Sequence, residues 1–287
     1  MSEPAPRRRR LAVVIGSGGV KCAAALGMRQ VLEREGIPID MFVGCSGGSI
    51  YAATAALGFT TEEAREATLR LWTREVTGRR RRGGLLQLLF PKRFGFTERF
   101  GMRDDRPILE RLRAGFGDRT FADVRTTLYV AATDFRTGEQ VVISEGTLVD
   151  AVRASIAIPF VLPAWPVGDR LLVDGFLSDP LPVNIAIREG ADLILAMGFE
   201  SPMQSRLTSP VRFIFQISTI MTNNLLRSRY AFHSQVHHAD VIAVMPDFRD
   251  RIGLFATEKI PRIIEDGARA TEAHLPYIKR LLAGVAD

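Results

Sequence analysis

The sequence is poor in cysteine and in long hydrophobic runs. Two cysteines among 287 residues exclude a disulfide scaffold and are compatible with a reducing compartment. No stretch approaches the roughly 20 uncharged apolar residues that a membrane-spanning helix needs. The longest apolar candidates, residues 154–167 and 213–221, are too short and are interrupted by proline or polar residues. A protein that spans a membrane by helices is therefore not expected.

The first residues also lack the apolar stretch of a secretion signal. Four arginines, Arg7 to Arg10, precede only five apolar residues before glycines interrupt at residue 16. Because a signal peptide needs a longer apolar region, we expect a cytoplasmic protein. We expect residues 1–10 to form a flexible basic terminus.

Positive charge is present in excess but is unevenly distributed. The net charge is +6, and two runs, Arg7–Arg10 and Arg79–Arg82, hold eight of the positive charges. Without them the chain is close to neutral, so its basicity lies in two patches. Such patches suggest a nucleic-acid or membrane partner. With 46% hydrophobic and 24% charged residues, the rest is typical of a soluble globular protein.

Short apolar strands alternate with helical segments along the chain. Strands are expected at residues 11–15 and 39–43, each followed by a glycine-rich turn and a helix, at 20–36 and 49–57. This alternation predicts an α/β fold with a parallel sheet and helical crossovers. Further strands are expected at residues 128–133, 140–143, 170–173, 192–197 and 241–245, and a further helix at 61–76.

The alternation continues without a clear linker or an internal repeat, which predicts one domain over residues 11–287. Residues 78–101 interrupt the pattern and are interpreted as an insertion or lid. Residues 201–287 are expected to form a helical tail with a last strand.

A turn with the pattern G-x-S-x-G, residues 44–48 (GCSGG), lies between a predicted strand and a predicted helix. A serine on such a turn projects its hydroxyl above the sheet edge, and the glycines Gly44 and Gly48 let the backbone bend. We therefore expect Ser46 to be a nucleophile; the alternative is a purely structural turn. Cys45 is a rival nucleophile, but a small buried side chain is the favoured interpretation.

A second glycine-rich turn, residues 16–21 (GSGGVK), follows the first predicted strand. At the same sheet edge as Ser46, the amides of Gly18 and Gly19 would stabilise an oxyanion. The alternative is a phosphate site, although the residues match neither the dinucleotide-binding nor the P-loop pattern.

Serine needs an activating partner, and Asp174 is the favoured one. It ends the strand predicted at 170–173 and is followed by Gly175, so a parallel strand would bring its carboxylate to the edge that carries Ser46. The order Ser46, Asp174, histidine also fits an α/β-hydrolase triad, but that fold places more strands before its nucleophile. The four histidines all lie beyond residue 230.

Several motifs stand in a fixed order along residues 11–200. They are SGGVKC at 17–22, GCSGG at 44–48, ATD and TGE within 132–139, ASIAIPFVLP at 154–163, DGF at 174–176 and DPLPV at 179–183. In these motifs the sequence resembles the patatin-like phospholipase family, particularly its bacterial members.

The resemblance implies a three-layer α/β/α sandwich with a mostly parallel central sheet. It also implies a dyad of Ser46 and Asp174 that hydrolyses an acyl ester, a phospholipid or lysophospholipid, through an acyl-enzyme. The amides of Gly18, Gly19 and Val20 would hold the oxyanion. Lys21, Gly44, Gly48 and Gly175 would support the motifs. No metal or other cofactor is implied.

Three residues depart from the family pattern. Ser17 and Cys22 replace glycines of the loop, and Phe176 replaces the small residue after Asp-Gly. A bulky Phe176 would either narrow an acyl pocket or pack against the sheet. These departures keep open a catalytically silent lipid-binding scaffold, next to the hydrolase and the phosphate-binding or nucleotide-binding protein.

The predicted insertion joins arginines to apolar side chains. Arg79–Arg82 lead into an apolar segment, residues 85–96, and cations beside leucine and phenylalanine suit an anionic lipid surface. Peripheral contact with an anionic membrane through residues 79–96 is one interpretation, and a solvated loop is the other. Nucleic-acid binding fits less well because aromatic residues do not interleave with the charges.

Overall fold

The computed structural model describes residues 8–71, 87, 90–203, 210–236, 239–248, 250, 252–253 and 256–283. Most of the apolar and basic part of the predicted insertion at 78–101, including Arg79–Arg82, lies outside these residues. So do His237 and His238. The interpretation of the insertion as a lid therefore stays a prediction.

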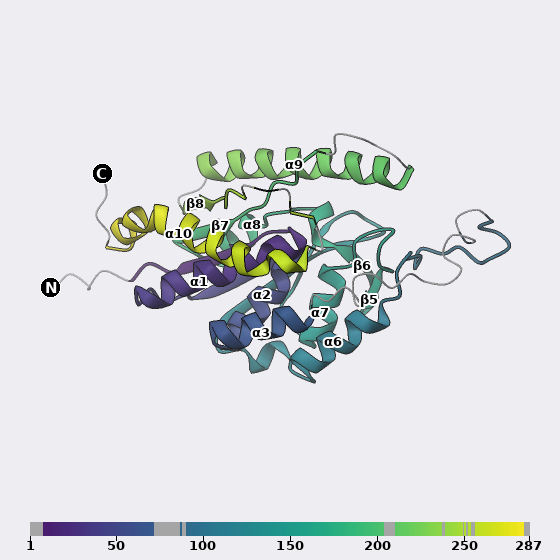
Figure 1. Cartoon of the computed structure of the whole chain (residues 1–287), viewed down its shortest axis with the longest axis horizontal. Helices are drawn as coiled ribbons and strands as arrows, with labels where there is room; N and C mark the ends of the chain where they lie inside the picture. The colour runs from purple at the N-terminus through teal and green to yellow at the C-terminus, as the bar shows by residue number, and fades with distance from the viewer. Residues whose placement is uncertain are drawn as a thin grey trace.

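The described part of the chain forms an eight-stranded mixed sheet that is the middle layer of the molecule (Figure 1). The order is β5-β6-β3-β2-β1-β7-β8, with β4 paired to β3. Strands β3, β2, β1, β7 and β8 are parallel, whereas β4 and β6 run antiparallel to β3, and β5 runs antiparallel to β6. The bounds are β1 Leu11–Ile15, β2 Met41–Cys45, β3 Thr127–Asp134, β4 Gln140–Ile143, β5 Trp165–Val167, β6 Arg170–Asp174, β7 Leu193–Met197 and β8 Asp240–Val244.

Helices cover both faces of this sheet, which confirms the three-layer sandwich. The larger layer contains α1 (Ala24–Arg34), α2 (Gly47–Ala56), α3 (Thr61–Leu71), α6 (Arg106–Phe116), α7 (Leu148–Ser155) and α10 (Ile260–Leu282). The other layer contains α8 (Val183–Arg188) and the long α9 (Pro210–Val236). Four 3-10 turns lie between these elements: η1 (Gly19–Ala23), η2 (Phe121–Asp123), η3 (Gly175–Leu177) and η4 (Thr257–Lys259).

Strand β1 shows why its sequence is continuously apolar. Leu11, Val13 and Ile15 pack into the core under the larger helical layer. Ala12 and Val14 belong to the second core, against α8 and α9. Because helices cover both faces of the sheet, a central strand has no solvent-facing side on which polar residues would be favoured.

The C-terminal part of the described chain packs against its N-terminal part. Strand β8 pairs with β7, and α10 packs along α1. The two helices meet at glycines: a Cβ on Gly27 would lie 2.0 Å from the carbonyl oxygen of Ile264, and one on Gly267 would lie 2.1 Å from that of Ala24. Their backbones therefore touch, which no larger residue would allow.

Arg8 to Arg10, the last residues of the basic terminus expected at 1–10, are bound by carboxylates. Arg8 pairs with Asp40, and Arg9 pairs with Asp240. The backbone N–H of Arg10 donates to a carboxylate oxygen of Asp192 at 2.7 Å. Carboxylates at the N-terminal ends of the neighbouring strands thus bind these three residues. Residues 1–7 lie outside the described residues, so the flexible terminus stays a prediction.

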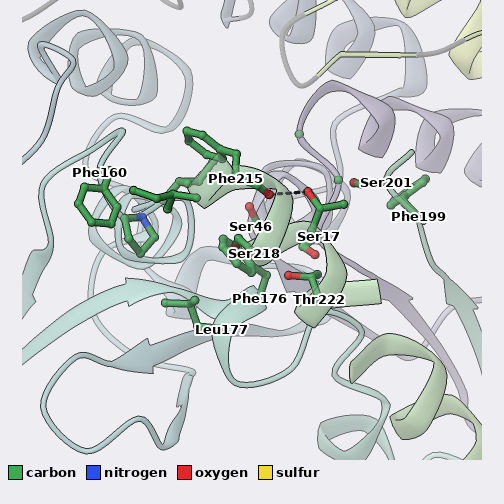
Figure 2. Close-up of a pocket in the computed structure, with 16 residues that line it drawn as sticks. Ser17, Ser46, Phe160, Phe176, Leu177, Phe199, Ser201, Phe215, Ser218 and Thr222 are labelled. Atoms are coloured by element: carbon green, nitrogen blue, oxygen red, sulfur yellow. Dashed lines mark hydrogen bonds between the residues drawn. The ribbon is translucent and has the colours of Figure 1, made fainter. Parts of the chain in front are cut away.

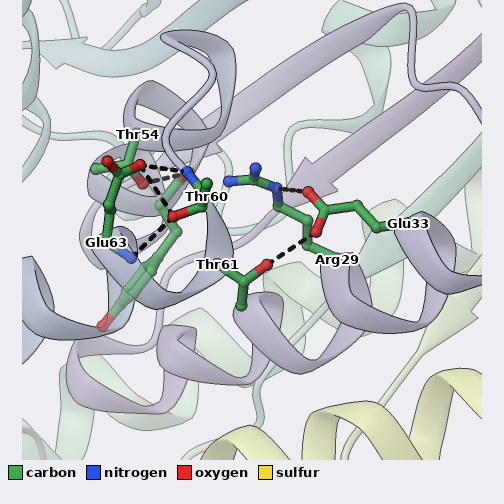
Figure 3. A network of polar contacts seen from close by, with 7 residues as sticks. Arg29, Glu33, Thr54, Thr60, Thr61 and Glu63 are labelled. Carbon is green, nitrogen blue, oxygen red and sulfur yellow. Dashed lines mark hydrogen bonds and ion pairs between the residues drawn. The ribbon is translucent and has the colours of Figure 1, made fainter.

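A polar network fixes the start of α3 against α1 (Figure 3). The Glu63 carboxylate accepts hydrogen bonds from the backbone N–H and the hydroxyl of Thr60, while the Glu63 N–H donates to that hydroxyl. This is a capping box, which satisfies amides that a helix start leaves free. Glu33 of α1 accepts from Arg29 and from Thr61. The helix thus begins at Thr61, as predicted.

Candidate active site

Ser46 occupies the turn between β2 and α2 and has a strained backbone, with φ +54° and ψ −130°. This is the geometry expected of a nucleophile turn. Its glycine neighbours are sterically required. A Cβ on Gly48 would lie 2.3 Å from the Ile15 carbonyl oxygen, and one on Gly44 would lie 2.5 Å from the Ser49 backbone. The turn can form only where these side chains are absent.

The structure brings the Ser46 hydroxyl and the Asp174 carboxylate together. The Ser46 Oγ donates to Asp174 Oδ2 at 2.7 Å, and Phe176 N–H donates to Asp174 Oδ1 at 3.1 Å. Asp174 is fully buried and Ser46 nearly so. The Ser46 N–H in turn donates to Ser155 Oγ at 2.8 Å, and that hydroxyl donates to the Ala131 carbonyl. Both residues are therefore held by fixed partners.

Asp174 reaches Ser46 by a route that differs from the predicted one. The prediction assumed that the strand ending at Asp174 is parallel to β2, but β6 runs antiparallel to β3. Strand β3 extends beyond β2, and β6 returns beside it, so that Asp174 pairs with Ala132 while Cys45 pairs with Ala131. Strand β6 thus runs back along β3 and ends at Asp174, within one residue of the level at which β2 ends.

Gly175 allows this close approach. A Cβ at this position would lie 2.5 Å from the Ala131 carbonyl oxygen and 2.9 Å from Cys45 Sγ. The Asp-Gly pair is thus explained by packing: the carboxylate bonds Ser46, and the glycine lets the chain pass close to the Ala131 backbone of β3.

Burial raises the pKa of Asp174 to about 7, because an ionised carboxylate loses its hydration there. The hydrogen bonds from Ser46 and from the Phe176 amide oppose this effect only in part. A carboxyl group with a pKa near neutrality can both accept and return a proton under physiological conditions.

The glycine loop lies beside the nucleophile turn. A Cβ on Gly47 would lie 2.6 Å from the Gly19 carbonyl oxygen, so the loop packs directly on the residue after Ser46. Outside helices and strands, no backbone hydrogen bond among the described residues has the N–H of Gly18, Gly19 or Val20 as its donor. Free amides at the start of a 3-10 turn are what an oxyanion site requires. Gly18 and Gly19 line the cavity at Ser46, whereas Val20 is fully buried behind them.

Lys21 has its amine turned to the neighbouring chain segment. The buried Lys21 Nζ donates to the Glu200 carbonyl at 2.8 Å and to Ser201 Oγ at 3.3 Å. Burial lowers the pKa of Lys21 to about 8, although Glu200 opposes the shift. The amine therefore fixes the segment after β7 instead of offering its charge to a phosphate in the glycine loop.

The two cysteines are free, buried thiols. Cys22 Sγ donates to the Gly16 carbonyl at 3.3 Å, and Cys45 Sγ donates to the Asp179 carbonyl at 3.4 Å. Burial raises the pKa of both thiols well above the ordinary value. Such thiols are poor nucleophiles, which agrees with the interpretation of Cys45 as a small buried side chain.

A cavity of about 240 Å³ opens onto Ser46 (Figure 2). Phe160 and Leu177 lie at one end of it, and Phe199 and Ser201 at the other, with Ser46 between them. Apolar side chains and small hydroxyls make up most of its wall. They are Ser17, Ile158, Pro159, Phe160, Phe176, Leu177, Phe199, Ser201, Ile214, Phe215, Ser218, Thr219 and Thr222. Phe176 and Ser17, two of the departures from the family pattern, thus belong to the wall of the cavity.

Helix α9 forms one wall of this cavity, which the sequence did not predict. Asn223 holds the helix to the segment after β7: its side chain accepts from Ser201 N–H at 3.1 Å and donates to the Ser201 carbonyl at 2.9 Å. Arg227 forms a two-point ion pair with Glu200. Ser155 and Phe160 are two further residues of the site whose roles were not predicted from the sequence, although both lie in the motif at residues 154–163.

No histidine of the described chain lines the cavity. His233 is buried in α9, and the ring of His274 bonds the Ala270 carbonyl within α10. Within the same residues there is no cluster of three or more side chains that suits a metal ion. The groups that face one another at the cavity are therefore a serine and a carboxylate.

Comparison with known proteins agrees with this arrangement. A model of the patatin-like phospholipase family matches residues 13–187, which is more than half of the chain. The chain belongs to the patatin-like phospholipase family. The match includes the glycine loop, Ser46, Ser155 and Asp174, and it ends before α9.

Two relatives show how much of the chain is shared. The uncharacterized NTE family protein Rv1063c of Mycobacterium tuberculosis is 32% identical over 188 residues, or 66% of this chain and 48% of that protein. Patatin-like phospholipase domain-containing protein 6 of Mus musculus is 29% identical over 205 residues, or 69% of this chain and 14% of that protein. The chain thus spans half or less of the length of these relatives.

The same fold occurs in a solved bacterial structure. VipD from Legionella pneumophila superposes with a TM-score of 0.52 at 15% identity, over 95% of this chain and 67% of that one. At this identity the likeness concerns the fold alone. The expected fold class is confirmed.

Proposed function

We propose that this protein is a serine acyl hydrolase that cleaves carboxylic esters of lipids or lysolipids with a dyad of Ser46 and Asp174. The observation that carries the proposal is the 2.7 Å hydrogen bond from Ser46 Oγ to a buried carboxylate with a pKa near 7, on a strained turn facing a cavity. Membership in the patatin-like phospholipase family supports the same class of chemistry.

In the first half-reaction, Ser46 Oγ attacks the ester carbonyl carbon while its proton passes to Asp174. The carbonyl oxygen becomes an oxyanion, which the free amides of the glycine loop stabilise. Collapse of this intermediate breaks the bond to the alcohol, which leaves with the proton from Asp174. The acyl group remains on Ser46 as an ester.

In the second half-reaction, water attacks the acyl-enzyme. Asp174 takes a proton from the water and returns it to Ser46 Oγ as the carboxylic acid leaves. The carboxyl group is thus base and acid in turn, a role that suits a pKa near neutrality. These steps use only groups of this chain and water.

The wall of the cavity supports a lipid-like substrate. The end formed by Phe160 and Leu177 is apolar and suits an acyl chain. Hydroxyls of Ser201 and Thr222 lie toward the other end, and they suit a polar alcohol or head group. We infer that the scissile ester lies between these two ends, over Ser46.

The proposal is tested with a p-nitrophenyl ester and a fluorophosphonate probe. Ser46→Ala and Asp174→Asn should each lower turnover by about 10³-fold or more. The probe should label the parent chain but not Ser46→Ala. Asp179→Asn is the matched control, because Asp179 is an equally buried carboxyl that bonds the Leu181 amide instead of Ser46. Turnover by Ser46→Ala at the parent rate would refute the proposal.

Absence of probe labelling in a folded parent chain would favour the silent lipid-binding scaffold. The phosphate-binding alternative gains no support from the geometry, because the Lys21 amine bonds the Glu200 carbonyl and Ser201.

We further propose that the enzyme acts in the cytoplasm and touches anionic membranes through residues 79–96. Two cysteines, both free, are compatible with a reducing compartment and support the first part. The arginine run beside apolar residues supports the membrane contact. Cosedimentation of an Arg79–Arg82→Ala variant with anionic vesicles tests it; binding equal to that of the parent would make the patch an ordinary surface loop.

A further inference from the structure

Helix α9 presents apolar side chains to solvent over its first half. Phe213 is 54% exposed, Ile217 43%, Ile220 41% and Met221 66%. The intervals of four, three and one residues place them on one side of a helix with 3.6 residues per turn. This set is called the α9 strip below. A soluble helix ordinarily has polar residues on its outer side, so the strip needs a separate explanation.

The strip is not needed for packing within the domain. The inner side of α9 is formed by other residues: Leu226 lies in the core under the helix, and Asn223 is bound to Ser201. None of the four strip residues lines the cavity at Ser46, although Ile214 and Ser218 on the adjoining side do. The strip thus lies next to the cavity without being part of it.

The charge of α9 indicates what covers the strip. Its 27 residues include three arginines, Arg212, Arg227 and Arg229, and no aspartate or glutamate. Glu200 balances the charge of Arg227, and no acidic residue of the helix itself offsets Arg212 or Arg229. An apolar surface on a basic helix is typical of segments that lie in the interface of anionic lipids. None of the helices in the described residues is long and apolar enough to cross a membrane. A position flat on the lipid surface agrees with both findings.

We propose that the α9 strip docks the protein on an anionic lipid surface and thereby places the Ser46 cavity at that surface. Phe160 and Leu177, which line the cavity, are themselves 41% and 44% exposed, so apolar surface is present at the cavity as well as on the strip. Docking by the strip is independent of hydrolysis. Only its use for supplying substrate rests on the proposed function.

Helix α9 is fastened so that docking fixes the position of the cavity. The Asn223–Ser201 contacts and the Arg227–Glu200 ion pair tie its middle to the segment that carries Phe199 and Ser201, both in the cavity wall. Insertion of the strip into a lipid surface would therefore hold the wall of the cavity at a constant distance from that surface.

Binding is measured in the Ser46→Ala background, so that no hydrolysis changes the vesicles. Vesicles of phosphatidylcholine with phosphatidylglycerol are compared with vesicles of phosphatidylcholine alone. A triple variant, Phe213→Gln with Ile217→Gln and Ile220→Gln, should bind the anionic vesicles about tenfold or more weakly. The control is Leu69→Gln with Tyr277→Gln, which changes residues of similar exposure on α3 and α10, in the layer across the sheet. It should bind like the parent.

A second measurement uses a variant that keeps an apolar side chain at every position of the α9 strip. Fluorescence of an Ile220→Trp variant should shift to shorter wavelength when anionic vesicles are added, because the ring leaves water. In the active chain, the triple variant should hydrolyse a water-soluble short-chain ester at the parent rate but a vesicle-borne lipid about tenfold or more slowly.

Equal vesicle binding by the triple variant and the parent overturns the proposal. A lower oligomeric state of the triple variant, without an effect on vesicle binding, would mean that a second copy covers the strip, which also overturns it. If the parent chain binds vesicles but hydrolyses no ester, the proposed function is contradicted, whereas the docking surface is still supported.

Discussion

Ser46 and Phe160 are the two residues other than glycine that have a positive φ in the described part of the chain, at +54° and +64°, and both line the same cavity. A left-handed backbone is costly for a residue with a bulky side chain. Phe160 is held in this state by its neighbours: its carbonyl accepts from Met102 N–H at 2.9 Å, and its ring meets that of Phe100 edge to face. The left-handed backbone thus places an aromatic ring at one end of the cavity.

Phe160 should therefore contribute to activity at the expense of stability. Phe160→Gly and Phe160→Ala both remove the ring, but only glycine relieves the backbone strain. We expect the glycine variant to be more stable than the alanine variant by about 1 kcal/mol, measured by urea denaturation. Both should lose rate on long-chain esters more than on short-chain esters. Equal chain-length profiles in parent and variants would show that the ring does not contact the acyl chain.

The pH dependence of activity should follow Asp174. The carboxyl must be ionised to accept the Ser46 proton, and burial raises its pKa to about 7. We expect kcat/KM to rise with pH through a midpoint near 7 and to fall about tenfold per pH unit well below it. Asp179→Asn should leave this midpoint in place. A midpoint near 4 would contradict the assignment.

The same group should make the folded state less stable as pH rises. A raised carboxyl pKa means that the folded chain binds the proton more tightly than the unfolded chain does. Its stabilising contribution is complete below about pH 4 and is lost as pH rises through about 7. From pH 4 to pH 8, the free energy of unfolding of Asp174→Asn should therefore rise relative to that of the parent by an amount on the order of 2–4 kcal/mol. Urea denaturation at both pH values measures this difference.

Ser155 should act as a positioning residue for the nucleophile. Ser155→Ala leaves the buried Ser46 N–H without its acceptor, at a cost of about 1–3 kcal/mol in stability. We expect kcat to fall, with the pH midpoint unchanged because Asp174 keeps its contacts. Thr68→Ala is the control, since Thr68 is a buried hydroxyl that bonds the Ala64 carbonyl within α3. It should lower stability without lowering kcat in the folded protein.

Replacement of glycine by alanine should have opposite effects on stability at the contact between α1 and α10 and at an uncrowded position in α6. Gly27→Ala places a methyl group 2.0 Å from the Ile264 carbonyl, so the helices must separate, at a cost of about 2–4 kcal/mol. Gly115→Ala, inside α6, meets nothing within 4 Å and should instead stabilise the protein by about 0.5–1 kcal/mol. Thermal unfolding of the two variants checks both signs. Similar shifts in both would contradict the close packing of α1 and α10.

The sequence was sufficient to predict those parts of the site that depend on local pattern. The Ser46 turn needs a buried strand, small residues and a helix within a few positions, and all three are visible in the sequence. Strands β1 and β4 have the predicted bounds, because apolar runs that end at glycine or turn residues define them. Asp174 was placed correctly at a strand end.

The remaining features depend on long-range packing. The direction of β6 is set by its pairing with β3 and not by its own residues, so the parallel arrangement assumed for Asp174 was wrong. Likewise, the segment at 213–221 shows only as an interrupted apolar run in the sequence. Its place beside the cavity depends on Asn223, whose partner Ser201 lies 22 residues away, and on Leu226, which belongs to the core formed with β1 and α8.

The family match ends at residue 187, yet Phe199, Ser201 and the α9 side chains belong to the wall of the Ser46 cavity. Under the proposed mechanism, the dyad that would cleave the ester thus lies inside the family match, whereas part of the wall that would contact the substrate lies outside it. Substitutions at Phe199, Ser201 or the lining residues of α9 would therefore change the wall of the cavity without changing Ser46 or Asp174. A chimera that exchanges residues 199–236 with those of a relative should carry over substrate preference while Ser46 and Asp174 stay unchanged.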